Sequence, residues 1–305
     1  MKNLPLHLWD IPTDATATLI NVSENETYLI EGGDFKAVLR VHRQRYHTER
    51  AIECELEWSA ALPLNTPTAI AGIDGQTVQS VDSRFMVLFN YINGEHPGQS
   101  EDLTASFTEL GRIAAQTHNH SQSWAPPENF ERLTWGLVEV FGENAKWGDW
   151  RDAPNVTNDI RRILERVERV VKHRLSAFGK TAENYGLIHA DMRLANILVH
   201  NGNMRLIDFD DCGFGWFLYD FAAAISFIED DQQVPALRKA WVKGYRKVRP
   251  LSDAEVFEID SFIMLRRMAL LAWIGSHMAA TEPQVLAHDF ARVTAELGTL
   301  YLAKM

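Results

Sequence analysis

The 305-residue chain has little cysteine and no long uncharged apolar run. It contains only two cysteines, Cys54 and Cys212, which are too few for a disulfide framework or a zinc-ribbon spacing. The longest uncharged apolar stretch, residues 221–228, is far too short to cross a bilayer, and the start MKNLPLHLWDIP lacks the apolar run of a signal peptide. We therefore expect reduced thiols, no membrane partner and a cytoplasmic location.

The chain also lacks clustered positive charge. Its formal net charge is -11 and its basic runs are short, so we expect no large surface for nucleic acid. No GxxxxGK[ST] pattern occurs, which excludes a P-loop enzyme as far as motifs can exclude one. What the chain does have is an ordinary globular composition, 46% hydrophobic and 23% charged, in enough residues to build two separate cores.

Short β-rich runs separated by turn signals fill the N-terminal part of the chain. The runs ATLINV, TYLIEG and FKAVLRV predict a three-stranded antiparallel meander, with a turn at Gly32-Gly33-Asp34 before the last strand. A helix is expected over about residues 48–62, followed by a further hairpin around residues 74–75 and the strand RFMVLFNYI. The loop after this strand predicts two lobes, residues 1–96 and 97–305.

From residue 102 onward the hydrophobic period becomes helical. Apolar residues share one face over residues 107–117 and form a cleaner stripe over residues 160–175. Ser252 and Glu255 have capping-box spacing ahead of another amphipathic segment. The expected fold class is therefore α+β, with a small β-rich N-terminal lobe that carries one helix and a larger, mainly helical C-terminal lobe.

The segment LIHADMRLANILVHNGNMRLIDFDD, residues 187–211, holds the residues with a clear chemical meaning. The Asn-Gly pair at residues 201–202 predicts a two-residue hairpin, because both turn positions need positive φ. Such a hairpin brings Asn196 and Asp208 to its open end, but strict alternation puts them on opposite faces, so the ladder must twist or stop there. One amide and one carboxylate oxygen suit Mg²⁺. Asp191 lies outside the strand, where it can face an incoming hydroxyl group.

This segment resembles the catalytic and metal-binding loops of the kinase-like superfamily, with the patterns H-x-D-x-x-x-x-N over residues 189–196 and I-D-F over residues 207–209. It is most similar to the aminoglycoside phosphotransferase and homoserine/choline kinase group, in which an Asp-hydrophobic-Ala stretch follows, here residues 220–222. The upstream AVLR, residues 37–40, falls in the expected order, and the resemblance covers about residues 21–228. It implies a two-lobed protein-kinase-like fold and a phosphotransferase that uses ATP and Mg²⁺.

The resemblance also implies a role for each matched residue. Asp191 would accept the proton of the acceptor hydroxyl group, and Asn196 and Asp208 would hold Mg²⁺. His189 and Asp220 would give structural support to the catalytic loop. These are residue types that phosphoryl transfer requires, since the reaction depends on positioning and on neutralising charge.

For the nucleotide, the resemblance implies that Arg40 contacts the phosphates and that Glu55 positions it. Arg40 stands where many kinases have Lys, which replaces a point charge with a planar fork. No GxGxxG loop occurs, and SENETY takes its place in the sequence. We therefore expect Ser23, Asn25 and Thr27 to cradle phosphate with hydroxyl groups and backbone amides.

Several residues have competing structural interpretations. Glu55 belongs to a helix rich in glutamate, which is also typical of a solvated acidic face. His189 is expected to organise its loop and not to carry a proton. Asp210 and Asp211 extend the metal site or solvate a turn, with equal support. Tryptophans within residues 135–150 could line a pocket for an amine through cation–π contacts, although packing is the more usual role.

We expect a kinase that moves the γ-phosphoryl group of ATP to a hydroxyl group of a small, amine-bearing molecule. The acidic balance, the similarity to small-molecule kinases and the lack of the Ala-Pro-Glu segment of protein kinases favour this function. The alternatives are a Ser/Thr protein kinase of the same fold, a metallohydrolase that uses His189 and Asp191 as ligands, and a catalytically inactive nucleotide-binding protein. The sequence identifies neither the acceptor, nor the choice between ATP and GTP, nor the oligomeric state.

Overall fold

The computed structural model describes residues 4–22, 25–98 and 102–305, and it divides into two compact units. Unit 1 consists of Met1–Glu95, Ala125–Arg132 and Arg205–Asp210, and unit 2 consists of His96–Trp124, Leu133–Met204 and Asp211–Met305. The first break lies beside the boundary expected after residue 96. Two short segments from later in the chain also belong to unit 1.

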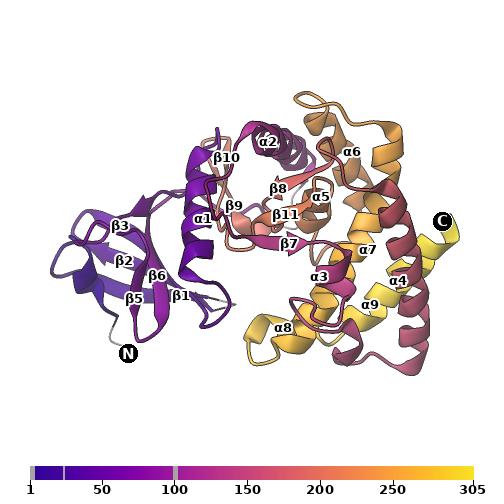
Figure 1. Ribbon diagram of the computed structural model, residues 1–305, viewed down its shortest axis with the longest axis horizontal. Coiled ribbons are helices and arrows are strands. Elements are labelled where there is room, and N and C mark those ends of the chain that lie inside the picture. Colours follow the sequence, from indigo (N-terminus) through magenta and orange to yellow (C-terminus); the bar gives the residue numbers. More distant parts are fainter. Residues whose placement is uncertain (1–3, 23–24, 99–101) are drawn as a thin grey trace. The chain divides into compact units, whose positions relative to one another are not determined.

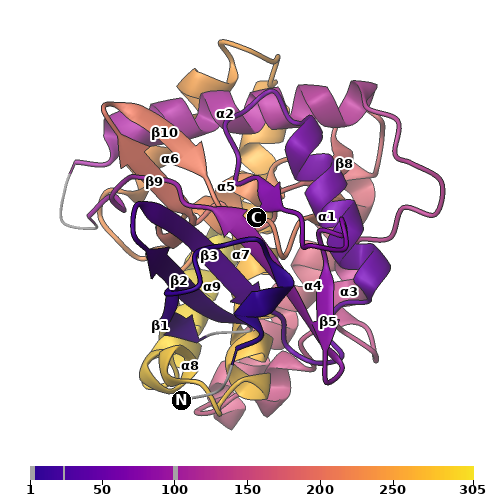
Figure 2. The ribbon, with the colours of Figure 1, turned by 90° about the vertical axis from the view of Figure 1, so that its left-hand side faces the viewer.

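Unit 1 is built on an antiparallel sheet and one long helix. Its described elements are a 3₁₀ turn (Leu6–Leu8), β1 (Thr16–Val22), β2 (Glu26–Gly32), β3 (Phe35–Val41), α1 (Glu49–Ala61), β4 (Ala69–Ile70), β5 (Gln79–Val81) and β6 (Arg84–Asn90). The strand order is β1-β2-β3-β6-β4, with β5 also paired to β6. Figure 2 shows β1, β2 and β3 side by side, and their antiparallel pairing confirms the predicted meander.

The hairpin expected around residues 74–75 is wrong in its pairing. β4 and β5 flank this turn, but both pair with β6 and not with each other. The two-residue hairpin joins β5 to β6 instead, where Asp82 and Ser83 have positive φ values of 51° and 61°. Asp-Ser is a weak hairpin signal because both residues have a Cβ atom, which makes positive φ less favourable than in glycine.

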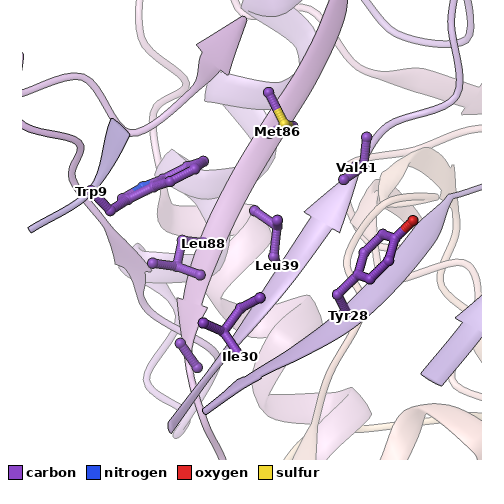
Figure 3. Close-up of a cluster of buried hydrophobic side chains, with 8 residues drawn as sticks. Trp9, Tyr28, Ile30, Leu39, Val41, Met86 and Leu88 are labelled. Atoms are coloured by element: carbon purple, nitrogen blue, oxygen red, sulfur yellow. The ribbon is translucent and has the colours of Figure 1, made fainter. Parts of the chain in front are cut away.

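Alternation along β6 divides the apolar residues of unit 1 between the two faces of the sheet. Met86 and Leu88 belong to the cluster on one face, together with Trp9, Tyr28, Ile30, Ala37, Leu39 and Val41 (Figure 3). Val87 and Phe89 belong to the cluster on the other face, where α1 packs through Ile52 and Leu56. Arg40 lies opposite Val87 in the β3–β6 ladder, so its side chain is on the face covered by α1.

Unit 2 is mainly helical. Its described helices are α2 (Thr104–Ser123), α3 (Leu137–Phe141), α4 (Asn158–Phe178), α5 (Tyr219–Ala224), α6 (Val234–Tyr245), α7 (Asp253–Ser276), α8 (Thr281–Leu286) and α9 (Phe290–Lys304), with 3₁₀ turns at Trp150–Asp152 and Leu194–Asn196. α4, α7 and α9 pack against one another (Figure 1). The predicted capping box of α7 is confirmed, since Ser252 and Glu255 exchange both hydrogen bonds. In the described ranges, no helix combines the length and apolar character needed to span a membrane.

The remaining strands form two small sheets. β7 (Leu133–Trp135), β11 (Gly213–Trp216) and β8 (Tyr185–Ile188) pair in the order β7-β11-β8, and β9 (Ile197–His200) pairs with β10 (Asn203–Leu206). The division between the units passes through β10. Asn201 and Gly202 have φ values of 50° and 74°, which confirms the predicted two-residue turn. The α+β class expected from the sequence is confirmed.

Candidate active site

In unit 2, Asn196 at the end of the loop that follows β8 contacts the Asp191 carboxylate. Asn196 Nδ2 donates to Asp191 Oδ2 at 2.7 Å and to the Asp191 backbone oxygen at 2.9 Å. Because the amide nitrogen of Asn196 faces Asp191, its Oδ1 is left for another partner. The Asp191 side chain keeps 16% exposure, so part of it remains accessible to solvent.

Two arginines flank the same carboxylate. Arg266 Nη2 lies 2.6 Å from Asp191 Oδ1, and Arg193 Nε lies 3.4 Å from Oδ2. Arg266 comes from α7 and is buried, and its Nε donates to Ser226 Oγ at 3.2 Å. Burial acts to lower the pKa of Arg266, but Tyr219 and Asp191 raise it above its usual value. The guanidinium therefore stays charged, and Asp191 lies in a fixed cationic environment.

Asp220, at the start of α5, supports the loop that carries Asp191. Its carboxylate accepts hydrogen bonds from the backbone N–H groups of His189 at 3.2 Å and Ala190 at 2.7 Å. Ala190 has a φ of 65°, a left-handed conformation that costs a residue with a Cβ atom about 1–2 kcal/mol. The charge-assisted bond to Asp220 helps to offset this cost. The predicted supporting role of Asp220 therefore has a defined set of contacts.

The histidines of this region make structural contacts. His189 is buried, and the Asp191 backbone N–H donates to its Nδ1 at 3.3 Å. His118 is buried between Asp220, 3.0 Å from its Nε2, and the Tyr245 hydroxyl, 2.9 Å from its Nδ1. No group of three or more His, Cys, Asp or Glu side chains is arranged to hold a metal within residues 4–22, 25–98 and 102–305. The metallohydrolase alternative therefore lacks a ligand set in these ranges.

In unit 1, Arg40 and Glu55 form a buried ion pair. Arg40 Nη2 donates to both carboxylate oxygens of Glu55 at 2.7 Å, and the two side chains are 7% and 2% exposed. Glu53 and Glu57 lie closer to the surface of the same helix and bind Arg50. The acidic face of α1 is thus made by the other glutamates, and the solvated-face interpretation does not hold for Glu55.

Arg40 also contacts Asp208, the predicted metal ligand. Its Nη1 lies 3.2 Å from Asp208 Oδ1, and the Asp208 side chain remains 47% exposed. Asp208 has a φ of 60° and follows the end of β10, while Asn196 closes a 3₁₀ turn just before β9. The ladder therefore stops before both residues, which removes the alternation conflict that a regular hairpin would impose.

Asp210 is buried in unit 1 and does not solvate a turn. Asn25 Nδ2 donates to its Oδ2 at 2.9 Å, and nitrogen atoms of His42, His47 and Arg40 lie 3.4, 3.6 and 3.9 Å from its Oδ1. Burial acts to raise the pKa of Asp210, but Arg40 and His47 hold it well below its usual range. The charge of Asp210 is therefore already compensated by side chains of unit 1.

The structure describes only part of the segment SENETY, which was expected to bind phosphate. Ser23 lies outside the described residues. Thr27 lies opposite Arg40 in the β2–β3 ladder. Both polar ends of the Asn25 side chain are engaged, since its Oδ1 also accepts a hydrogen bond from the Arg43 backbone N–H at 3.0 Å. A contact between the Asn25 side chain and phosphate would require these bonds to be exchanged.

The three tryptophans between residues 135 and 150 are buried, in agreement with the packing interpretation. Trp135 Nε1 donates to the Asp211 backbone oxygen at 2.7 Å. The guanidinium of Arg266, and not an open pocket, faces the ring of Trp147, 5.5 Å from its centroid. The sequence motifs do not include Arg266. The available signal was an arginine pair within the otherwise apolar run FIMLRRMALLAWIG.

Comparisons with known proteins identify the family and the fold. The sequence model described as the phosphotransferase enzyme family matches residues 16–251. A solved microcompartment-associated aminopropanol kinase is 40% identical, with a TM-score of 0.91 and coverage of 98% of this chain and 96% of that chain. An amicoumacin kinase in complex with AMP-PNP, Ca²⁺ and Ami is 17% identical, with a TM-score of 0.77 and coverage of 95% and 90%. A homoserine kinase from Gluconobacter oxydans (strain 621H) is 28% identical over 248 residues, 76% of this chain and 72% of that protein. The kinase-like fold expected from the sequence is confirmed.

Proposed function

We propose an amino alcohol as the phosphate acceptor of this chain, which belongs to the phosphotransferase enzyme family and is a small-molecule kinase. The observation that carries the proposal is the 40% identity to an aminopropanol kinase over nearly the whole of both chains. The reaction would move the γ-phosphoryl group of ATP to the acceptor hydroxyl group. The expected cytoplasmic location stays a prediction.

Asp191 is the general base of this proposed reaction. The acceptor hydroxyl group gives its proton to the Asp191 carboxylate while its oxygen attacks the γ-phosphorus, and the bond from that phosphorus to the β,γ-bridging oxygen breaks to release ADP. Two observations support this role. The carboxylate is partly exposed, and Arg266 and Asn196 fix its orientation through short contacts.

The oxygen donors of Asn196 and Asp208 fit Mg²⁺, which prefers carboxylate and amide oxygens and keeps several waters. The amide nitrogen of Asn196 is used by Asp191, which leaves its Oδ1, and Asp208 is 47% exposed. When bound, Mg²⁺ would neutralise phosphate charge. The AMP-PNP and Ca²⁺ bound to the amicoumacin kinase support a nucleotide with a divalent cation in this fold.

Arg40 is proposed to bind the nucleotide phosphates from unit 1. Its Nη2 is anchored by Glu55, while its Nη1 lies 3.2 Å from Asp208 and 3.9 Å from Asp210. In the proposed complex a phosphate oxygen would accept a hydrogen bond from this Nη1. An arginine held at one end by a buried carboxylate loses little conformational freedom when it binds phosphate. In this way Arg40 can serve in place of the lysine of other kinases.

The amine of the acceptor is assigned to Glu282 at the start of α8. Arg193 contacts Asp191 through Nε and Glu282 through Nη1 at 2.8 Å, so it links the proposed base to a second carboxylate. Glu282 is 37% exposed and can meet an ammonium group whose hydroxyl end lies at Asp191. We propose this arrangement in place of a tryptophan face, because the tryptophans of residues 135–150 are buried.

A hydroxyamino acid such as homoserine is the second candidate acceptor. It is favoured by the homoserine kinase relative and by the cation of Arg193 beside the base, because homoserine carries a carboxylate as well as an amine. Arg193 keeps 20% side-chain exposure, which leaves room for such a contact. The same ammonium site at Glu282 would serve both acceptors.

A coupled ADP-release assay against a panel of acceptors tests the proposal. The panel contains 1-amino-2-propanol, ethanolamine, homoserine, choline, an aminoglycoside, a neutral polyol and a Ser/Thr peptide. We expect the highest kcat/KM for a primary amino alcohol, and Glu282→Gln should raise its KM while leaving the KM of ATP unchanged. A higher kcat/KM for homoserine would select the second candidate. A preference for the polyol or the peptide would refute both.

A further inference from the structure

α6 and α7 line a groove in unit 2 that is separate from the residues around Asp191. Its volume is about 930 Å³, near the upper end of the range of roughly 300–1,000 Å³ typical of ligand pockets. Apolar side chains from both helices contribute to its lining, namely Val234, Pro235, Val242, Val256 and Ile263. None of these residues takes part in the catalytic contacts described above.

The groove is strongly basic in a chain whose net charge is -11. Its lining includes six basic residues and one acidic residue, in chain order Arg238, Lys239, Lys243, Arg246, Lys247, Asp260 and Lys304. Some of this charge is compensated, since Asp260 lies 2.7 Å from Arg238 and 3.2 Å from Lys304, and Asp253 lies 2.6 Å from Arg246. The three remaining lysines are exposed, and no ion-pair partner for them occurs among the described residues.

These three lysines follow one another at intervals of four residues. Lys239 and Lys243 lie on α6, and Lys247 lies in the turn after it. At a rise of about 1.5 Å per residue, they spread positive charge over roughly 12 Å along the groove. The apolar lining runs beside this row of charge, since Val242 lies on the same helix and Val256 and Ile263 come from α7.

We propose that this groove binds an acidic, amphipathic peptide segment of another protein. A row of lysines beside an apolar lining complements a helix that has glutamates at four-residue spacing on one side and leucines on the next. The local positive charge of the groove would also orient an acidic segment that reaches it.

The linear arrangement of the three lysines favours a peptide over a small anion as the ligand. A phosphate site gathers its donors around one point and holds them by further bonds, whereas these lysines are exposed and lie in a row. The apolar lining favours a peptide over nucleic acid, because a phosphate backbone has nothing to bury against Val242 and Ile263. The ligand must therefore be elongated and must carry an apolar side.

Fluorescence anisotropy with a synthetic peptide tests the proposal on the full chain. The probe is a labelled helical peptide with Glu and Leu repeated on adjacent faces, and its comparison is a scrambled peptide of the same composition. Lys239→Glu/Lys243→Glu/Lys247→Glu should weaken binding of the probe at least tenfold. The milder Lys239→Gln/Lys243→Gln/Lys247→Gln should weaken it about threefold, without placing new negative charge near the C-terminus of α6.

A matched control carries the same change in charge on another helix of unit 2. Arg162→Glu/Arg166→Glu/Arg169→Glu reverses three exposed residues of α4 and should leave peptide affinity within twofold of the starting protein. All variants should keep their phosphotransfer rate, because the groove lies outside the catalytic contacts. Equal weakening in the control, equal binding of the scrambled peptide, or displacement of the probe by inorganic phosphate or ADP would each overturn the proposal.

Discussion

Replacing Arg266 with methionine tests how the proposed base is held in place. Arg266→Met keeps a long apolar stem but removes the guanidinium that lies 2.6 Å from Asp191 Oδ1 and 3.2 Å from Ser226 Oγ. Asp191 would keep its bond to Asn196 at Oδ2, so one end of the carboxylate stays fixed and the other becomes free to turn. The expected effect is a misoriented base and not an unfolded protein.

The size of the effect follows from these contacts. A hydrogen bond to a charged group contributes about 1.5–3 kcal/mol, and Asp191 is 16% exposed, so we expect the free energy of unfolding to fall by about 2–3 kcal/mol. A displacement of about 1 Å at the reacting groups costs on the order of 10²-fold in rate. We therefore expect kcat for the best acceptor to fall roughly 10²-fold. The Kd of ATP should not change, because Arg266 contacts none of the proposed nucleotide ligands.

Arg267→Met is the matched control for this experiment. Arg267 is the neighbouring residue on α7 and equally buried, but it binds Glu229 and Thr294 and makes no contact with Asp191. It should lose stability without the same loss in kcat. The measurements are urea denaturation for stability, ADP release for kcat and isothermal titration for nucleotide binding.

A double-mutant cycle with Asp191→Asn decides whether Arg266 acts through the base. If Arg266 only orients the Asp191 carboxylate, Arg266→Met should reduce the residual rate of the Asp191→Asn enzyme by less than about threefold. Arg266→Lys restores the charge but cannot reach Asp191 and Ser226 with the same planar fork, so it should give an intermediate rate. A full 10²-fold loss in both backgrounds would refute the reasoning.

Three further outcomes are expected. Asp191→Asn should lower turnover by roughly 10²-fold or more while nucleotide binding persists, and near-normal turnover would remove Asp191 from the mechanism. Asp208→Ala should abolish Mg²⁺-dependent nucleotide binding and Asn196→Ala should weaken it, as measured by titration with and without Mg²⁺; unchanged affinity in both variants would exclude them as ligands. Burial lowers the pKa of His118 from its usual 6.5, so below that pH the unfolded chain takes up a proton that the native protein does not. The free energy of unfolding should therefore decrease as the pH is lowered below 6.5, by up to about 1.4 kcal/mol per pH unit. His118→Gln should flatten this fall in urea denaturation from about pH 7 to about pH 5, and an unchanged slope would count against it.

The parts of the fold that depend on local spacing were predictable from the sequence. Alternation and turn residues predicted the meander β1-β2-β3, and the helix expected over about residues 48–62 is α1, which has Thr48 as its N-cap. The Asn-Gly turn at residues 201–202 was predictable because few other dipeptides accept positive φ at both positions. The pairing of β4 with β6 was not, because it joins strands that are separated in sequence, and the β5–β6 hairpin was not, because its turn residues Asp82 and Ser83 are a weak hairpin signal.

The features of the site that the sequence does not predict depend on contacts between distant parts of the chain and on local backbone conformation. Arg266 follows Asp191 by 75 residues, and an arginine in an apolar helix does not reveal which carboxylate it meets. Asp208 and Asp210 stand two residues apart in the string IDFDD, yet one is 47% exposed and the other is buried. The left-handed conformation of Asp208 changes the direction of the chain at this point, and no local residue pattern predicts it.

The buried cluster around Asp210 predicts that positions 40 and 210 covary in evolution. Arg40 offers separate N–H groups to Glu55 and Asp208 and lies 3.9 Å from Asp210, whereas a lysine has a single ammonium that cannot reach all three carboxylates at once. A change of Arg40 to Lys would leave Asp210 buried with less compensating charge, which is costly unless Asp210 is replaced as well. Natural relatives with Lys at position 40 should therefore rarely keep Asp at position 210. Where Arg at position 40 has been exchanged for Lys during evolution, the replacement of Asp210 should have come first.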